Sequence, residues 1–157
     1  MKTAITVRET GLESDSDKRR LVTLLEAYKA DPMGGGSPYS DEEASRLISG
    51  LSDHPKAVIL FCFSEGEFAG GAVCFETFAT FTARPCINIH DICVLPAFRG
   101  MGLGRELMNG VIEKAKRIGA GKITLEVRKD NTAAKQLYAS EGFGLTDPEM
   151  LFYTKML

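Results

Sequence analysis

Several features that would assign this sequence to a common functional class are missing from it. Lysine and arginine number 19 against 21 acidic residues, which gives a net charge of −2. The sequence therefore lacks the basic excess of a nucleic-acid-binding protein, and we expect no nucleic-acid partner. No run of about 18 apolar residues occurs, and the first residues contain no apolar core followed by a cleavage site. We therefore expect no membrane span, no membrane partner and no signal peptide.

Metal-ligand spacing is missing as well. The four cysteines fall in expected strands and are too scattered to form a metal-binding motif; they are Cys62, Cys74, Cys86 and Cys93. We expect buried, reduced thiols, no metal and a cytoplasmic location. The length of 157 residues is near the common size for one hydrophobic core, so we expect a single domain over residues 1–157.

What the sequence does have is a strand, a glycine-rich turn and a helix in succession. A run rich in β-branched residues covers 87–94 and ends before Pro96, which has no N–H for a continuing sheet. The turn Arg99-Gly-Met-Gly-Leu-Gly104 follows, and then a helical apolar pattern that stops at Gly119. Such an arrangement directs free backbone N–H groups at an anion, usually a phosphate. The alternative is a tight connection that needs glycine only for its positive φ angles.

The glycine spacing excludes two common phosphate sites. A nucleotide P-loop needs Gly-Lys followed by Ser or Thr, and neither tripeptide occurs. A dinucleotide fingerprint needs G-x-G-x-x-G and an acidic residue that closes the next strand. This turn reads G-x-G-x-G, and Glu126 lies within the next expected strand rather than at its end. A dinucleotide-dependent oxidoreductase is therefore only a distant alternative.

The remaining pattern indicates an α/β layered domain with a mixed sheet. Helices are expected from Ser14 to before Asp31, from Ser40 to about residue 51, and over 132–141 after an Asn131 cap. Strands are expected over 4–8, 56–64, 68–78, 122–127 and 151–157, with 78–86 as a connection. The loop 33–39 is glycine-rich; it is either a linker or a wall over a substrate, and Tyr39 is its residue best suited to contact a ligand.

Two separated motifs resemble those of the GNAT N-acetyltransferases. Arg99-x-x-Gly102-x-Gly104 is similar to the acetyl-CoA pyrophosphate loop of that family. The block from Asn131 through Ala134 to Tyr138 is similar to its later motif. The resemblance implies a single-domain, three-layer fold with a mostly antiparallel mixed sheet, a splayed strand pair and about four helices. It also implies acetyl-CoA as co-substrate.

The resemblance implies roles for individual residues. Tyr138 matches the tyrosine that points at the CoA sulfur, and we expect it to protonate the leaving thiolate; the alternative is a packed aromatic side chain. Asn131 either caps its helix or also contacts the CoA arm. The expected cofactor-binding residues are Ile92, Cys93, Val94, Arg99, Gly100, Met101, Gly102, Leu103, Gly104, Asn131 and Ala134.

The acceptor amine needs a base, because an alkyl ammonium ion is about three pH units from neutral at physiological pH. The candidates for this base are His90 and Asp91, in the expected strand over residues 87–94. Regular alternation places them on opposite faces unless a bulge intervenes, and strands of this family typically carry one there. Residues 75–94 further resemble the diamine acetyltransferase branch, which has Glu-Asp where this sequence has His90-Asp91. A single histidine in a strand often has a structural role instead. Glu76 and Glu126 are weaker candidates for attracting the cation or relaying its proton.

We therefore expect an acetyl-CoA-dependent N-acetyltransferase acting on a small cationic primary amine by direct attack in a ternary complex. The alternatives are an acyl-CoA-binding sensor or inactive domain, and a protein N-terminal or lysine acetyltransferase. A homodimer is one option for the oligomeric state, because members of this family are often dimers.

Overall fold

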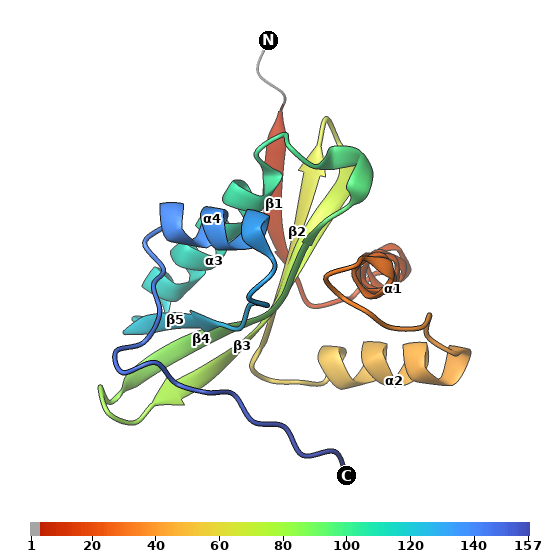
Figure 1. Ribbon diagram of the computed structural model, residues 1–157. Helices are drawn as coiled ribbons and strands as arrows, with labels where there is room; N and C mark the ends of the chain where they lie inside the picture. The colour runs from red at the N-terminus through yellow and green to blue at the C-terminus, as the bar shows by residue number, and fades with distance from the viewer. Residues whose placement is uncertain (1–3) are drawn as a thin grey trace.

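The computed structural model describes residues 4–157 and contains one five-stranded sheet between two helical layers. The strands are β1 (Ile5–Thr10), β2 (Ala57–Ser64), β3 (Glu67–Ala79), β4 (Arg84–Val94) and β5 (Lys122–Leu125). Their order in the sheet follows the chain, and every pair is antiparallel except β4 with β5. Figure 1 shows helices α1 (Asp15–Ala30) and α2 (Asp41–Ser52) on one side of the sheet, and α3 (Leu103–Arg117) and α4 (Thr132–Ser140) on the other. The expected three-layer α/β fold with a mixed sheet is confirmed.

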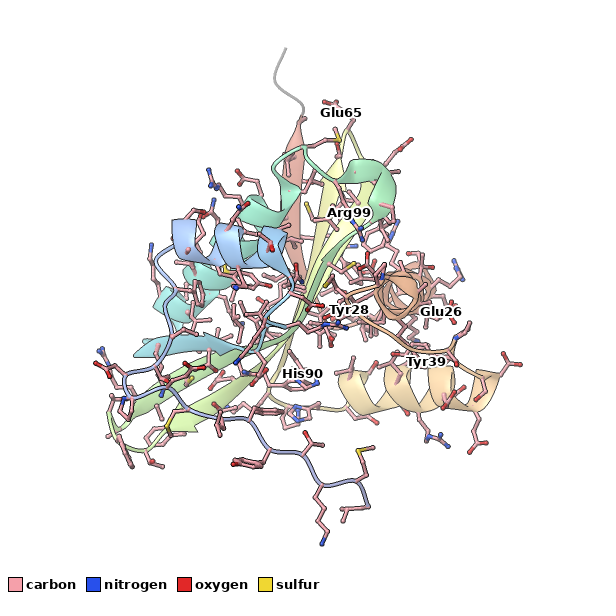
Figure 2. The ribbon with its side chains drawn as sticks, in the orientation of Figure 1. Glu26, Tyr28, Tyr39, Glu65, His90 and Arg99 are labelled. Atoms are coloured by element: carbon pink, nitrogen blue, oxygen red, sulfur yellow. The ribbon has the colours of Figure 1, made fainter. Side chains whose placement is uncertain are left out.

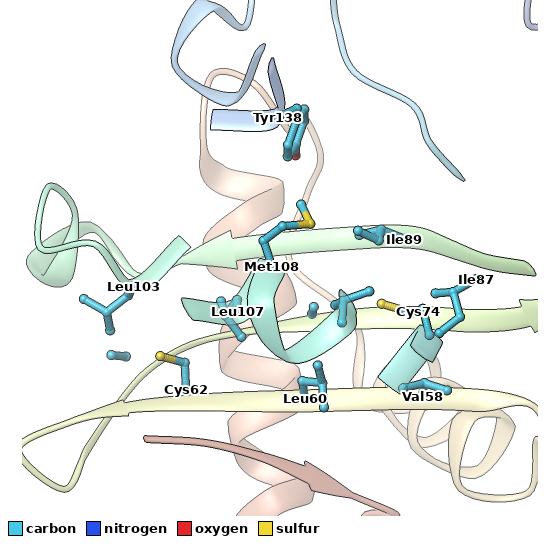
Figure 3. Close-up of a cluster of buried hydrophobic side chains, with 14 residues drawn as sticks. Val58, Leu60, Cys62, Cys74, Ile87, Ile89, Leu103, Leu107, Met108 and Tyr138 are labelled. Carbon is cyan, nitrogen blue, oxygen red and sulfur yellow. The ribbon is translucent and has the colours of Figure 1, made fainter. Parts of the chain in front are cut away.

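The two sides of the sheet have separate cores. On the α3 side, buried residues of β2, β3 and β4 pack against one face of α3, as Figure 3 shows for Leu107, Met108 and Ile89. On the α1 side, a smaller cluster joins Leu21 and Leu25 of α1 to Phe61 of β2 and Val73 of β3. The sheet therefore buries side chains on both faces, as the continuously apolar β2 predicts.

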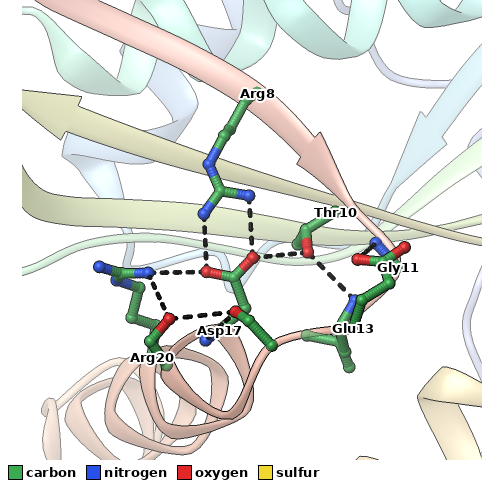
Figure 4. A network of polar contacts seen from close by, with 9 residues as sticks. Arg8, Thr10, Gly11, Glu13, Asp17 and Arg20 are labelled. Carbon is green, nitrogen blue, oxygen red and sulfur yellow. Dashed lines mark hydrogen bonds and ion pairs between the residues drawn. The ribbon is translucent and has the colours of Figure 1, made fainter.

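A buried carboxylate fixes the start of α1 against β1 (Figure 4). Asp17 accepts two hydrogen bonds from Arg8, at 2.6 and 2.8 Å, and further bonds from the Thr10 hydroxyl at 2.7 Å and Arg20 at 2.8 Å. The hydrogen bond from Arg8, ahead of those from Thr10 and Arg20, holds the pKa of Asp17 well below its ordinary value. Asp17 is therefore ionised at neutral pH, and its charge is fully compensated by this network.

The expected helix caps are present. Ser14 accepts a hydrogen bond from the Asp17 N–H, and Ser40 forms a reciprocal capping box with Glu43. At the start of α4, the Asn131 side chain accepts from the Ala134 N–H at 3.2 Å. These side chains satisfy N–H groups that have no partner within the helix, which is why the sequence marks these boundaries well.

Two expectations about strands are wrong. Residues 78–86 are not a long connection: β3 continues to Ala79 and β4 begins at Arg84, so a short hairpin turn joins them. Residues 151–157 form no strand. Their weak alternation of apolar residues does not suffice without a partner strand, and side chains such as Phe152 and Tyr153 are exposed, at 78% and 84%.

β5 is also shorter than expected, and its pairing with β4 is brief. It ends at Leu125, and the parallel pairing covers only Cys86–Ile89 of β4 against Lys122–Leu125. From His90 onward, β4 continues beside β3 alone. The two strands therefore separate in the middle of β4, which confirms the expected splayed pair. Within residues 4–157, no helix is long and apolar enough to cross a membrane.

Candidate functional site

The glycine-rich turn before α3 presents backbone N–H groups to open space. Gly100 and Gly102 have φ angles of 78° and 86°, a conformation that other residues rarely adopt. A Cβ atom at either position would meet nothing within 4 Å, so the outer surface of the turn is not covered by the protein. In the described part of the chain, the amides of residues 100–104 have no hydrogen-bond acceptor. Together with the positive end of the α3 dipole, they can receive an anion.

Gly104 serves a different purpose from the other two glycines. A Cβ atom there would lie 3.2 Å from the Leu137 side chain of α4 and 4.0 Å from that of Val94. Gly104 therefore allows the start of α3 to approach α4 closely. This contact holds the turn near the end of β4 and near the helix that carries Tyr138.

The end of β4 offers unpaired backbone groups beside this turn. The Leu95 N–H donates to the Ala69 carbonyl on β3 at 2.8 Å. Because successive residues of a strand direct their N–H groups to opposite sides, Val94 and Ile92 direct theirs to the edge that β5 leaves unpaired. Ile92, Cys93 and Val94 thus lie between the turn and the point where the strands separate; their contact with the cofactor stays a prediction.

Arg99 makes bonds within the protein at this place. Its Nε donates to the Val94 carbonyl at 3.0 Å, and its Nη2 lies 2.8 Å from an Asp31 carboxylate oxygen. The Arg99 side chain remains 47% exposed, so part of the guanidinium faces solvent next to the turn. Figure 2 shows Arg99 above Tyr28, between the end of β4 and α1.

Tyr138 lies on the α3 side of β4, within the larger core. Figure 3 shows it beside Met108, and its ring centroid is 6.0 Å from that of Phe143. Burial raises the pKa of Tyr138 to about 12, and neighbouring Tyr28 adds to the rise. The phenol is therefore fully protonated at neutral pH and can act as a proton donor. The packed environment and the expected role are compatible.

A β-bulge brings His90 and Asp91 to the same face of the sheet. Val73 pairs with Asp91 and the next residue, Cys74, pairs with Ile89, so His90 is the extra residue. Ile89 and Ile92 both pack on the α3 side, which regular alternation would forbid. His90 contacts the Phe75 ring, at 5.7 Å between centroids, on the α1 side.

Asp91 is a half-buried carboxylate without a cationic partner. No ion pair involves it in residues 4–157, whereas four other carboxylates on or near the sheet, those of Glu9, Asp17, Asp31 and Glu76, are paired. Burial raises its pKa, and the nearby His90 opposes the rise. Its charge in turn raises the pKa values of Tyr28 and Tyr39, although burial is the larger cause for both. Tyr28, Tyr39 and His90 are therefore the groups that interact electrostatically with Asp91, and together with it they mark one place on the α1 side of β4.

Two further residues shape this place and were not predicted. Glu26 accepts a hydrogen bond from the Tyr39 N–H at 3.2 Å, and Lys29 lies 3.7 Å above the Tyr39 ring. Tyr28 lies in α1, within the helix expected from Ser14 to before Asp31, but no role at this place was predicted for it. Helical periodicity identifies the face on which Tyr28 lies, but it does not indicate that the Asp91 carboxylate of β4 lies near that face.

The weaker candidates lie elsewhere. Glu76 forms an ion pair with Lys56 at 2.5 Å, and Glu126 follows β5 and lies 3.5 Å from the Asn88 amide nitrogen. Neither belongs to the cluster around Asp91. No group of three or more His, Cys, Asp or Glu side chains among residues 4–157 is arranged to hold a metal ion.

The turn, the separated strands and the tyrosine beside them define the class of acetyl-CoA-binding acyltransferases. The chain belongs to the acetyltransferase (GNAT) family, whose family model matches residues 21–143.

Relatives carry N-acetyltransferase names. The uncharacterized N-acetyltransferase YhfO of Bacillus subtilis is 27% identical over 100 residues, 64% of this chain and 67% of that protein. The N-alpha-acetyltransferase RimI of Mycobacterium tuberculosis is 46% identical over 56 residues, 36% of this chain and 34% of that protein. Several other relatives are also matched over less than half of their own length.

Solved structures share the fold over the whole chain. The aminoglycoside N-acetyltransferase AAC(6')-Iy in complex with CoA superposes with a TM-score of 0.77 at 16% identity, covering 100% of this chain and 98% of that one. At this identity the likeness concerns the fold alone.

Proposed function

We propose that the protein transfers an acetyl group from acetyl-CoA to a small, cationic primary amine. The amine nitrogen attacks the thioester carbonyl carbon in a ternary complex, the C–S bond breaks and an amide forms. The observation that carries the proposal is Asp91, a half-buried carboxylate without a cationic partner in residues 4–157. Such a group, beside two tyrosines, attracts an ammonium ion by charge and by its aromatic neighbours.

In this proposal the cofactor lies across the separated ends of β4 and β5. The diphosphate binds the amides of residues 100–104, with the exposed edge of Arg99 beside it. The amides that Ile92 and Val94 direct to the open edge receive the thioester and the CoA arm. Asn131 and Ala134, at the start of α4, border the same arm.

Three side chains divide the proton chemistry. Asp91 attracts the amine as a cation, and His90 takes the proton that the nitrogen must lose, since an imidazole of pKa about 6.5 is a competent base. Tyr138, whose phenol is protonated at neutral pH, gives its proton to the sulfur as the thiolate leaves. The bulge matters because it places His90 and Asp91 on one face.

A second candidate acceptor is a protein N-terminus. The similarity to a protein named as an N-alpha-acetyltransferase favours it, although the match covers 56 residues. Other relatives and fold neighbours are named for small-molecule acceptors, streptothricin and aminoglycosides among them. The resemblance of residues 75–94 to the diamine branch and the unpaired Asp91 favour the small amine.

An acceptor panel tests the proposal. Release of CoA thiol from acetyl-CoA is measured with diamines, monoamines, aminoglycosides and N-terminal peptides. We expect turnover with small cationic amines, at a rate that rises with pH through one ionisation. Efficient acetylation of peptides with no small amine accepted would overturn the acceptor class. CoA binding without turnover of any acceptor would instead favour an acyl-CoA sensor.

Three variants then separate the roles of His90 and Asp91. His90→Ala should flatten the rise of rate with pH, whereas Asp91→Asn should mainly raise the KM of the amine. His90→Glu restores a base and should retain more activity than His90→Ala, with a preference for diamines. An unchanged pH profile in His90→Ala would assign the proton removal to another group.

The cytoplasmic location and the homodimer stay predictions. Light scattering tests the oligomeric state.

A further inference from the structure

The turn after α1 is contacted by two arginine side chains, one that follows β4 and one that follows β5. Arg99, after the end of β4, forms the 2.8 Å ion pair with Asp31. Arg128, after the end of β5, donates from Nη1 to the Pro32 carbonyl at 3.3 Å. Residues 31 and 32 therefore connect two segments that lose contact with each other where the pairing of β4 and β5 ends.

Asp31 also organises the first part of the glycine-rich loop. Its carboxylate accepts a hydrogen bond from the Met33 N–H at 2.9 Å, and its carbonyl accepts from Gly34 and Gly35 at 2.9 and 3.1 Å. The Met33 N–H, followed by Arg99, lowers the pKa of Asp31, so the carboxylate is ionised at neutral pH. The loop that begins here ends at Tyr39, one of the two tyrosines beside Asp91.

Arg99 therefore lies between the proposed diphosphate-binding turn and Asp31, which begins the loop on the acceptor side. Its Nε is fixed by Val94 and its Nη2 by Asp31, while its exposed part borders the turn of residues 100–104. A guanidinium group has five N–H donors in a rigid plane, so it can hold the carboxylate on one edge and an anion on another. An anion that fixes the guanidinium also fixes the carboxylate.

We propose that Asp31 is a positioning residue. Through Arg99, it links the loop of residues 32–38, called here the acceptor loop, to the diphosphate-binding turn of residues 100–104. Binding of CoA immobilises Arg99, Arg99 holds Asp31, and residues 32–38, which lead to Tyr39 beside Asp91, open less often. The inference rests on the proposed position of the diphosphate but not on the identity of the amine. Bound CoA would hold the loop of residues 32–38 more firmly in the arrangement that the Arg99–Asp31 ion pair already gives it.

Hydrogen exchange tests the link with CoA as the probe. In the wild-type protein, saturating CoA should slow amide exchange in residues 32–38 by about two- to fivefold, the range expected from one exposed ion pair. Asp31→Asn keeps an oxygen for the Met33 N–H but removes the charge that holds Arg99. We expect this variant to bind CoA yet to lose the slowing. Asp15→Asn, at the other end of α1, is the matched control and should retain it.

A comparison with Arg99→Gln separates the link from the cofactor site. Both variants should lose the slowing, but Arg99→Gln should weaken CoA binding more than Asp31→Asn does. CoA-dependent slowing that persists in Asp31→Asn, or is missing from the wild type, overturns the inference. Equal loss of CoA affinity in the two variants also overturns it, because Asp31 would then act on the cofactor alone. Exchange in residues 107–117 of α3, beyond the diphosphate-binding turn, serves as the reference for a general loss of stability.

Discussion

The two helical layers differ in how they are attached to the sheet. On one side, α3 buries five residues, Leu103, Leu107, Met108, Val111 and Ala115. On the other side, α2 buries none, and α1 is fixed at its start by the charged network of Asp17. The proposed cofactor side is thus held by the larger apolar core, whereas the proposed acceptor side combines a smaller apolar cluster, which includes Leu21 and Leu25 of α1, with a few polar contacts and a glycine-rich loop. Such a division allows the acceptor side to change without loss of the cofactor site.

The largest effect is expected from Tyr138 on the packed side. Tyr138→Phe should lower turnover by about 10²–10⁴-fold, on the order of 3 to 5 kcal/mol, because the phenol is needed as charge develops on sulfur. Acetyl-CoA affinity should change little, since the ring keeps its packing. Steady-state kinetics and CoA titration measure the two quantities. Tyr153→Phe, at an exposed tyrosine, is the control. Full turnover in Tyr138→Phe would mean that water or another group protonates the thiolate.

The comparison of the two layers can be tested by equal truncations. Leu107→Ala on α3 removes a side chain that is fully buried and should cost about 2 to 5 kcal/mol of unfolding free energy. Leu47→Ala on α2 removes one that is only half-buried, and should cost about 1 kcal/mol. Urea unfolding measures both. Equal costs would contradict the difference in attachment.

A charge substitution tests the polar attachment of α1. Asp17→Asn should destabilise the protein by about 1 to 2 kcal/mol at pH 7, because it weakens charge-assisted hydrogen bonds. Since the pKa of Asp17 is lowered on folding, its contribution is present above its unfolded pKa of about 4 and is lost as pH falls below that value. The wild type should thus lose stability between pH 5 and pH 3 more steeply than the variant. Thermal unfolding at several pH values checks this, and parallel curves would exclude Asp17 as the cause.

The same substitution at two glycines with similar backbone conformations distinguishes an effect on CoA binding from an effect of backbone strain on stability. Gly102→Val and Gly119→Val both place a β-branched residue at a positive φ angle, 86° and 70°, with nothing within 4 Å of the new Cβ atom. Each should cost about 1 to 2 kcal/mol of stability. Only Gly102→Val, at the start of α3, should also weaken CoA binding, by about tenfold. Calorimetric titration of both variants measures this, and equal CoA affinities would exclude the proposed position of the diphosphate.

Local patterns predicted the elements and the glycine turn, but not the contacts between distant segments. Ser40 and Asn131 act on amides three residues away, so their signals lie within a short stretch of sequence. Arg128 and Pro32 are 96 residues apart, and nothing near either residue indicates the other. The expected strand over 151–157 failed for the same reason, since a strand is defined by its partner.

The bulge in β4 has a consequence for how the chain tolerates deletion. Because Val73 pairs with Asp91 and Cys74 with Ile89, His90 is surplus to the ladder between β3 and β4. Removing it would leave Ile89 and Asp91 adjacent in regular alternation, with each side chain of the strand still on its present face. The residue proposed as the base is therefore an insertion that the sheet does not need. A reactive group carried in this way can be gained, exchanged or lost without repacking either core.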